Sequence, residues 1–511
     1  MTRIGMRRYH WMLLLVSGLG WAADNMWMQG VAIVLPRVQY YWDIQDTGIG
    51  LLTASLFAGM MLGSLAWGAW ADMFGRRFAF QRTLLVTATF GLAASAAPTF
   101  TTTCLCALGI GIGVGGSIPT DGTLVLESLP PHRQYLLTAL SVFFALGAVA
   151  AALVALAVLP GHSCTTEWPC PPGVHKDGWR WVLGLLGTLT GVFALLRCTA
   201  LRVQESPRFY GACGRQADAR AALEAIAGGI DEWEDLLADD VDGADTTTGH
   251  AATSGASGGG RDARGGDLAW GDAHAPDTAA HVPAAAHGAP ADAPPPTHAS
   301  GTRPPADGPA GHVTALLADC RVLFAGGRAR TTATVWGVWA LMSLGFTMFN
   351  AFYPMYLARK LGQQQAASET QALRGYLMYA LSSLPGSAIG TLLVESRLGH
   401  ARVLTLTLGV TAACMLLFVL ARAPLLVNSA GVLVSVSATT AYAVLYGATP
   451  QLFPTRVRNS ACAAANACGR VTGVAAPMLA GALLALGDSA PVSVGAGVFA
   501  LCAILAGRLD V

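Results

Sequence analysis

The chain has 511 residues, of which 53% are hydrophobic and only 12% are charged, and its formal net charge is +1. Soluble domains carry roughly 25% charged residues, so this composition excludes a water-soluble globule, and the lack of a basic block argues against nucleic-acid binding. The apolar residues come in runs of about 20, long enough for a helix to cross about 30 Å of hydrocarbon. We therefore expect an all-α protein embedded in a lipid bilayer.

The apolar runs predict twelve transmembrane helices, six before residue 200 and six after residue 330. The first six runs cover residues 11–35, 48–70, 79–98, 102–124, 136–159 and 179–199. The second six cover residues 332–356, 375–395, 402–421, 425–448, 460–485 and 490–507. We expect two six-helix bundles, at residues 1–200 and 331–511, joined by a central loop at residues 201–330.

The arginine and lysine residues of the short loops predict the orientation of these bundles. With both termini in the cytoplasm, twelve of these residues lie inside and seven outside. We therefore expect a multi-pass protein with cytoplasmic termini and a cytoplasmic central loop, in the plasma membrane rather than in a vacuole or vesicle.

The central loop changes composition between about Gly228 and His312, where Ala, Gly, Asp, Pro, Thr and His replace the aliphatic residues. Such a segment cannot bury enough apolar surface to offset its ordering entropy, so we expect disorder. Six of the eleven histidines lie here, but their spacing is irregular and no cysteine accompanies them. A solvated linker is favoured over a metal site.

Most of the eleven cysteines lie in apolar runs, where they pack as small hydrophobic residues. Cys164 and Cys170 differ, because they flank the sequence TTEWP in a short polar loop that is predicted to lie outside the cytoplasm. Two interpretations stay open for this pair: a local disulfide or two free thiols.

The loop after the second span carries the pattern GxxxDxxGRR, in the sequence GAWADMFGRR. Gly68 would let two helix backbones approach closely, and Gly75 would permit a tight turn. Asp72, Arg76 and Arg77 can bind neighbouring helix ends, although the two arginines alone would also fit ordinary positive-inside residues.

The fourth span contains the sequence GIGIGVGGSIPTDGTLVLESLP at residues 109–130. Its GxGxxG match lacks alternating strands and helices around it, so it indicates close helix packing rather than a dinucleotide site. The sequence ESPR begins at Glu205, after the sixth span, and FPTRVRN begins at Phe453, before the eleventh. Together these motifs resemble the major facilitator superfamily, in the branch of synaptic-vesicle-glycoprotein-like and organic-ion transporters that includes many fungal members.

The resemblance implies the major facilitator fold, in which two six-helix bundles enclose a central cavity and rock against each other. It also implies an inner gate at the cytoplasmic end, where Glu127 would pair with Arg133 or Arg76. The charged residues predicted for this gate are Asp72, Arg76, Arg77, Glu127, Arg133, Glu205, Arg208, Arg456 and Arg458.

Charged residues inside the spans are candidates for function, since a buried charge is unfavourable unless it is paired or neutralised. Asp24 lies near the middle of the first span, and its burial suits a proton-coupling site. Asn25 and Gln29 lie one helical turn apart beside it and could bind a solute. Asp121, in the fourth span, is a second proton-coupling candidate. The alternative for both acids is a structural contact with a neighbouring helix.

Arg470 lies twelve residues beyond Arg458 and therefore about 18 Å deeper along the eleventh span. An arginine at this depth should face a cavity or a counter-charge. In the organic-ion branch this position resembles the place where anion carriers keep an arginine, which implies an anionic substrate held by the guanidinium. The competing interpretation is a structural ion pair with Asp24 or Asp121.

Aromatic residues of the seventh span recur at helical spacing and define one face. Trp339, Phe346 and Tyr353 either pack against lipid and other helices or form a cavity wall that stacks an organic solute. Asn350 adds a polar group to this face, and Pro354 and Pro385 can supply hinges.

We expect a non-enzymatic secondary transporter that carries a small organic, anionic solute in symport with protons, without a cofactor or metal, and acts as a monomer in the bilayer. Two alternatives stay open: a non-transporting sensor or binding protein of the same fold, and a facilitator of neutral sugar-like solutes. The fourth span lacks the arginine with which it opens in sugar porters, and Leu105 or Cys106 takes its place.

Overall fold

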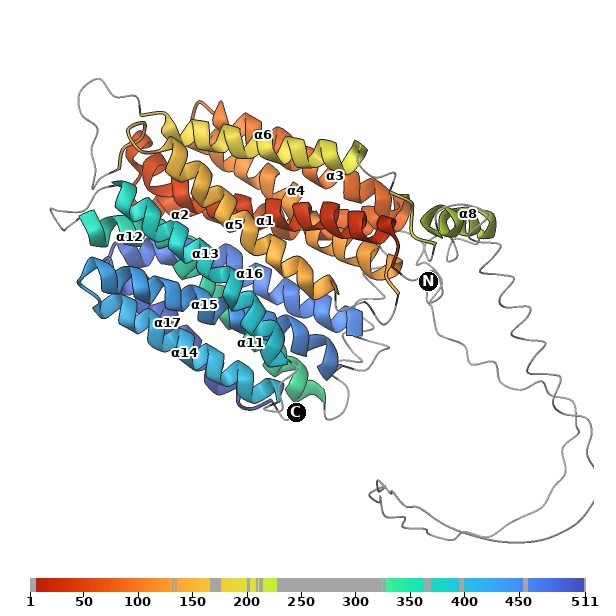
Figure 1. Cartoon of the computed structure of the whole chain (residues 1–511). Helices are drawn as coiled ribbons and strands as arrows, with labels where there is room; N and C mark the ends of the chain where they lie inside the picture. Colours follow the sequence, from red (N-terminus) through yellow and green to blue (C-terminus); the bar gives the residue numbers. More distant parts are fainter. Residues whose placement is uncertain are drawn as a thin grey trace, which may run out of the picture. The chain divides into compact units, whose positions relative to one another are not determined.

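The computed structural model describes residues 6–130, 133, 136–165, 176–199, 203–207, 210, 215–227, 324, 328–362, 369–394, 399–453 and 458–509. All regular structure within these ranges is helical. The N-terminal bundle contains α1 (Arg8–Trp42), α2 (Asp46–Phe74), α3 (Arg76–Ser95), α4 (Phe100–Ser128), α5 (Leu136–Val158) and α6 (Gly178–Thr199), and a short helix, α8 (Gln216–Ala227), follows it (Figure 1).

The C-terminal bundle is built from helices of similar length (Figure 1). It contains α11 (Arg328–Asn350), α12 (Tyr353–Gly362), α13 (Glu369–Val394), α14 (His400–Leu420), α15 (Pro424–Ala448), α16 (Arg458–Leu484) and α17 (Ala490–Ala506), with a 3-10 turn at Thr449–Leu452. The predicted seventh span is therefore two helices. Pro354 lacks the N–H that would bond to the Asn350 carbonyl, so the chain turns between α11 and α12. Pro385, the other predicted hinge, lies inside an unbroken α13.

Eight of the described helices are long and apolar enough to cross a membrane. The long helix α1 is not among these eight, since it carries Asp24, Asn25, Gln29 and Arg37. All four of these side chains are buried inside the bundle. Helix α1 thus holds several of the polar residues that were predicted to form the transport site.

Glycines bring α2 and α4 into backbone contact. A Cβ atom on Gly59 or Gly63 of α2 would collide with backbone atoms of α4, and a Cβ on Gly111 or Gly115 of α4 would collide with α2. This contact confirms the packing role predicted for the glycine-rich fourth span. The close approach predicted for Gly68 is not seen among the described residues, because none of their atoms lies within 4 Å of a Cβ placed there.

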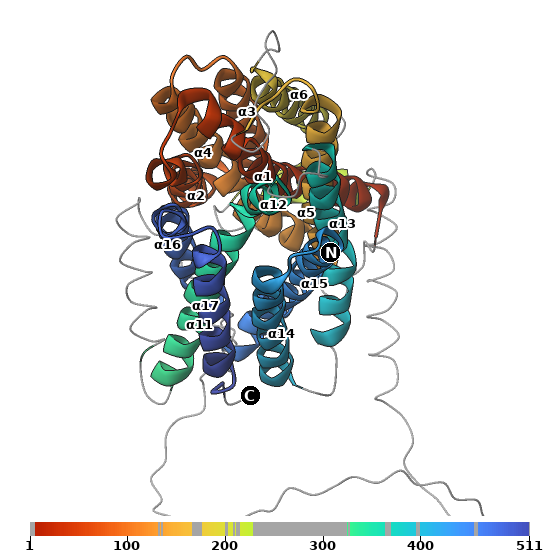
Figure 2. The ribbon, with the colours of Figure 1, turned by 90° about the vertical axis from the view of Figure 1, so that its left-hand side faces the viewer.

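The two bundles meet along two helix pairs, α2 with α16 and α5 with α13. Figure 2 shows both pairs side by side. Gly50 of α2 lies directly against the backbone of Pro477 in α16. The helix α1 lies between α5, α4 and α6 and also contacts α12, so its polar residues face both bundles.

Candidate transport site and gates

Asp24 lies fully buried near the middle of α1. Neither carboxylate oxygen has a hydrogen-bond partner among the described residues. The hydroxyl of Ser117 in α4 lies close enough to interact with it, but no hydrogen bond of ordinary geometry joins the two. A charged carboxylate in such a place is unfavourable by several kcal/mol. The site therefore suits a carboxyl group that takes up and releases a proton.

Asp121 is held by Arg197 of α6, a residue that the sequence analysis overlooked. The guanidinium binds both carboxylate oxygens, with Nη2–Oδ2 at 2.6 Å and Nη1–Oδ1 at 3.2 Å, and both side chains are fully buried. Arg197 also donates to the carbonyls of Phe80 (2.8 Å) and Val16 (3.3 Å). A Cβ atom on Gly20, one turn before Asp24 on α1, would collide with both members of this pair. The contact favours the structural interpretation of Asp121 over proton coupling.

Arg470 of α16 extends from the C-terminal bundle toward the N-terminal one. One of its nitrogens, Nη1, donates to the Met60 carbonyl of α2 at 3.3 Å. Its charge interacts with Asp24 and with the Tyr446 hydroxyl. The structure contradicts the predicted ion pair with Asp24 or Asp121, since Arg470 makes no salt bridge with any described carboxylate. Four of the five guanidinium N–H groups remain available to a ligand.

Amide and tyrosine side chains form a buried network between the bundles. Gln29 of α1 donates to Asn25 (3.1 Å) and to Asn350 of α11 (3.3 Å). Tyr376 donates to the Gln29 oxygen at 2.5 Å, and Tyr379 donates to the Asn350 oxygen at 2.8 Å. The structure thus joins three predicted binding residues from two bundles and adds two tyrosines of α13 that the sequence analysis missed.

The predicted aromatic face of the seventh span is divided by the turn between α11 and α12. Trp339 donates to the Thr449 hydroxyl at 3.0 Å and packs edge-on against Tyr446, with ring centroids 4.8 Å apart. Phe346 packs in the same way against Tyr442. These contacts favour a packing role for both residues.

Tyr353 belongs to a different aromatic cluster from Trp339 and Phe346, and it packs against Phe349 at the end of α11. Its ring stacks on Tyr379 at 4.3 Å, and its hydroxyl lies against Gly431 without a hydrogen-bond partner in the described part of the chain. This hydroxyl is a buried donor and acceptor beside the amide network. It is therefore the aromatic residue best placed to contact a solute.

Glu205 joins the segment after α6 to the start of α3. Its carboxylate accepts hydrogen bonds from the backbone N–H groups of Arg76 (2.8 Å) and Arg77 (3.0 Å). These are unpaired donors of the first helical turn, and the dipole at a helix N-terminus favours an acidic group there. Gly75 precedes them at φ +100°, a conformation that favours glycine.

Glu127 lies near Arg76 in the region predicted to form the inner gate. Glu127 Oε2 and Arg76 Nε are 3.9 Å apart, a loose ion pair within the N-terminal bundle. Arg76 also donates to the Ala71 carbonyl at 3.0 Å. The structure thus shows one of the two partners predicted for Glu127.

An ion pair links the bundles at the end remote from the two termini, which we call the distal end and which the orientation analysis predicts to be extracellular. Arg37 of α1 binds Glu369 of α13, with Nη2–Oε1 at 2.7 Å. Ser163 donates to the same carboxylate oxygen at 2.9 Å and accepts from Arg37 Nε at 3.1 Å. Only 5% of the Arg37 side chain is exposed.

A second contact at the distal end joins α12 to α2. Arg359 Nη2 lies 2.7 Å from Asp46 Oδ1, and Gln39 donates to the same oxygen at 2.6 Å. We call the pairs Arg37–Glu369 and Asp46–Arg359 the distal latch. No local pattern in the sequence pairs these two arginines with their partners, which lie more than 300 residues away in the same chain.

We expect reversal of the first latch pair to show whether it holds the bundles together. Arg37→Glu or Glu369→Arg alone leaves two like charges in a mostly buried place, so each should lower the melting temperature of the purified protein. The double variant recreates an opposite-charge pair and should recover much of the loss. Losses that simply add in the double variant would contradict a direct interaction.

Two comparisons of sequence relate this architecture to known proteins. Residues 24–248 match the family described as "Sugar (and other) transporter". An uncharacterized MFS-type transporter of Schizosaccharomyces pombe is 28% identical, over 99% of this chain and 85% of that protein. The synaptic vesicle 2-related protein of Xenopus laevis is 31% identical over 44% of this chain and 38% of its own length.

The solved structure of the E. coli xylose transporter XylE in a partially occluded inward-open conformation shares the fold. Its TM-score is 0.66, at 12% sequence identity, covering 99% of this chain and 98% of that one. The chain is thus similar in sequence to transporters of the major facilitator superfamily and shares their fold. The fold predicted from the motifs is thereby confirmed, and the chain is a multi-pass membrane protein.

Some predicted site residues lie outside the part of the chain that the structure describes. The side chains of Asp72 and Arg458, and the whole of Arg208, Arg456 and Cys170, lie outside the described residues. Cys164 is disulfide-bonded, and its pairing with Cys170 stays a prediction.

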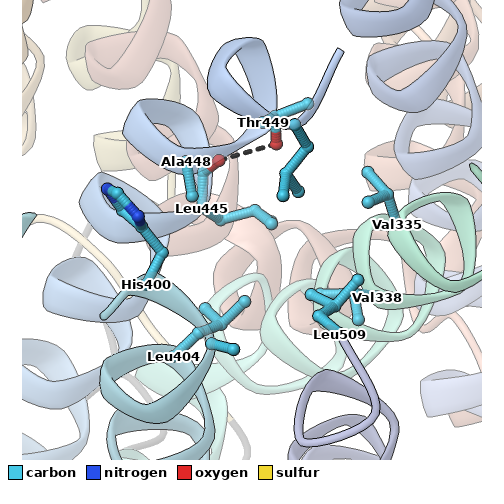
Figure 3. Close-up of a pocket in the computed structure, with 10 residues that line it drawn as sticks. Val335, Val338, His400, Leu404, Leu445, Ala448, Thr449 and Leu509 are labelled. Carbon is cyan, nitrogen blue, oxygen red and sulfur yellow. Dashed lines mark hydrogen bonds between the residues drawn. The ribbon is translucent and has the colours of Figure 1, made fainter. Parts of the chain in front are cut away.

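A small pocket at the end of the C-terminal bundle opposite the distal end is too small to be the transport site. Figure 3 shows its lining, in which Val335, Val338 and Leu404 surround a space of about 10 Å³. That volume is about enough for one water molecule. The polar residues of α1, α11, α13 and α16 are therefore the better candidate site.

Proposed function

We propose that this transporter carries a small anionic organic solute together with protons. The observation that supports the proposal is the placement of Asp24 and Arg470. Asp24 is a buried acid without a hydrogen bond among the described residues, and Arg470 is a cation of the opposite bundle whose charge reaches it. A guanidinium with several available N–H groups can bind a carboxylate through two parallel hydrogen bonds.

The same placement offers a physical mechanism of coupling. A deprotonated Asp24 and a bound solute carboxylate would both be attracted to the charge of Arg470. When the solute binds, two negative charges in a poorly solvated place favour protonation of Asp24. The solute and the proton therefore bind together and leave together, while the bundles rock about the site.

The amide and tyrosine network is proposed to contact the rest of the solute. Gln29 and Asn350 come from different bundles, so a solute bound between them would contact both. Movement of the bundles breaks their direct hydrogen bond, and a solute hydroxyl or carbonyl can replace it. The free hydroxyl of Tyr353 adds a further polar contact.

The charge balance makes this coupling testable. One proton carried with one monovalent anion moves no net charge, so only the pH gradient drives it. A difference of one pH unit should then sustain an anion gradient of about tenfold. Changing the membrane potential at constant pH gradient should leave accumulation unaltered.

An uptake screen in proteoliposomes tests the proposal. The solutes are a series of labelled organic acids, with xylose as a neutral sugar, at two external pH values and with a protonophore. Accumulation of an acid that collapses with the protonophore supports symport. Equilibration of xylose without accumulation would instead support a sugar facilitator that uses the amide network, and saturable binding without flux would support a sensor.

We expect Arg470→Lys to weaken binding of the transported acid about tenfold, because a lysine ammonium cannot make the bidentate contact. The change should appear in the KM of uptake. Arg220→Lys is the matched control, since Arg220 lies exposed on α8 and pairs with Glu224 one turn away. An unaltered KM in Arg470→Lys would remove this arginine from the binding site.

A further inference from the structure

A cavity of about 590 Å³ opens at the distal end of the C-terminal bundle, where α12, the end of α14 and the start of α17 meet. Its volume lies within the range of roughly 300 to 1,000 Å³ that is usual for small-molecule sites. Three cations line it, Arg359, Lys360 and Arg422, against one acid, Asp488. Phe418 and Val492 form the apolar part of the cavity wall. The lining therefore suits a small organic anion.

Lys360 gives the cavity a fixed positive charge. Its ammonium group donates to three backbone carbonyls at the end of α14, those of Phe418 (2.7 Å), Val419 (2.8 Å) and Ala421 (3.0 Å). These hydrogen bonds hold the charge in place beside the opening. An anion that binds there would not have to order a flexible side chain, which lowers the entropic cost of binding.

Arg359 lines the same cavity and also belongs to the distal latch. It binds Asp46 of the N-terminal bundle through Nη2 at 2.7 Å and Asp488 of its own bundle through Nη1 at 2.8 Å. Each contact uses a single carboxylate oxygen. A carboxylate that approaches from the cavity can offer two oxygens to the guanidinium, and such bidentate contacts are the stronger ones.

We propose that this cavity binds a small organic carboxylate, which competes with Asp46 for Arg359 and so loosens the distal latch. The site is separate from the central one around Asp24 and Arg470. The inference rests on the proposed function only for the class of ligand. By linkage, an anion that favours the open latch must itself bind more tightly when the latch is open.

Variants of the latch acid Asp46 and variants of the cavity cations should therefore shift the affinity for the anion in opposite directions. Asp46→Asn removes the competing carboxylate and should strengthen binding up to about fivefold. Arg422→Gln and Lys360→Gln each remove a cation of the cavity and should weaken it about tenfold. A loss of folding would weaken anion binding in every variant. It could not produce the stronger binding that is expected for Asp46→Asn.

The experiment is calorimetric titration of the full chain in phosphatidylcholine nanodiscs with benzoate, and with benzamide as its neutral counterpart. All titrations use protein that also carries Arg470→Gln, which removes the proposed carboxylate site in the centre. Any benzoate binding that remains is therefore assigned to the distal cavity, whether or not the proposed transport function is correct. Benzoate binding that exceeds benzamide binding and follows the opposite shifts supports the site. Hydrogen exchange at residues 353–362 should rise with benzoate, because the latch loosens.

Three results would overturn the inference. Equal binding of benzoate and benzamide would show that the cations do not contribute. An Asp46→Asn variant with unchanged or weaker binding would show that the carboxylate does not compete with the latch. Loss of benzoate binding in nanodiscs that contain phosphatidylglycerol would assign the cavity to a lipid headgroup rather than to a dissolved anion.

Discussion

Proteoliposomes that contain Asp24→Asn should show no accumulation of the transported acid under a pH gradient, while exchange of internal for external acid continues. The asparagine cannot bind and release a proton, yet it keeps the volume of the fully buried side chain. Exchange needs no net proton movement, because the loaded carrier returns without emptying. Accumulation should fall from about tenfold per pH unit to equilibration.

The measurement is uptake of the acid with and without an imposed pH gradient, beside counterflow from preloaded vesicles. Ser117→Ala is the matched control, because it removes a hydroxyl beside Asp24 without changing a titratable group. Unaltered accumulation and pH dependence in Asp24→Asn would exclude this residue as the proton site. Loss of both accumulation and counterflow would show that the variant blocks movement of the bundles instead.

Breaking the Asp121–Arg197 pair should have the largest effect on stability. Asp121→Asn or Arg197→Met leaves one charge buried and unpaired, and such changes destabilise a protein by about 3–5 kcal/mol. The double variant Asp121→Asn with Arg197→Met removes both charges and should recover much of this loss. Thermal unfolding in detergent measures the four proteins of this cycle.

The exposed pair Arg220–Glu224 supplies the control for that cycle. Its removal should change stability by only about 0.3–0.5 kcal/mol, the usual size for a helical surface pair. If the double variant also accumulates the acid with normal pH dependence, the structural role of Asp121 is established. Loss of coupling in a stably folded double variant would instead return Asp121 to the proton pathway.

The fold could be predicted from the sequence because the bilayer imposes a simple rule on it. Spans must be apolar and about 20 residues long, and the loop motifs occur at fixed places between them. The break in the seventh span shows the limit of this rule. The apolar run continues through Ala351 and Phe352, and only the missing N–H of Pro354 signals that the helix ends.

The site could be predicted only in part, since a sequence shows which residues are charged but not which charges meet. Asp24, Gln29 and Asn350 stand out because polar groups are rare in apolar spans. Arg197 does not, because it lies near the end of its span, where an arginine is ordinary. Its partner Asp121 comes from another helix, 76 residues earlier. Gly68 likewise fits a packing motif, although no described atom lies within 4 Å of a Cβ placed on it.

The turn between α11 and α12 connects two regions that otherwise look unrelated. Asn350, which meets Gln29 at the interface, is the last residue of α11, and Arg359 lies near the end of α12. The ten residues of α12 make a rod about 15 Å long that begins at this turn. A displacement of Asn350 by a bound solute would therefore be carried along a single short helix to Arg359 at the distal latch.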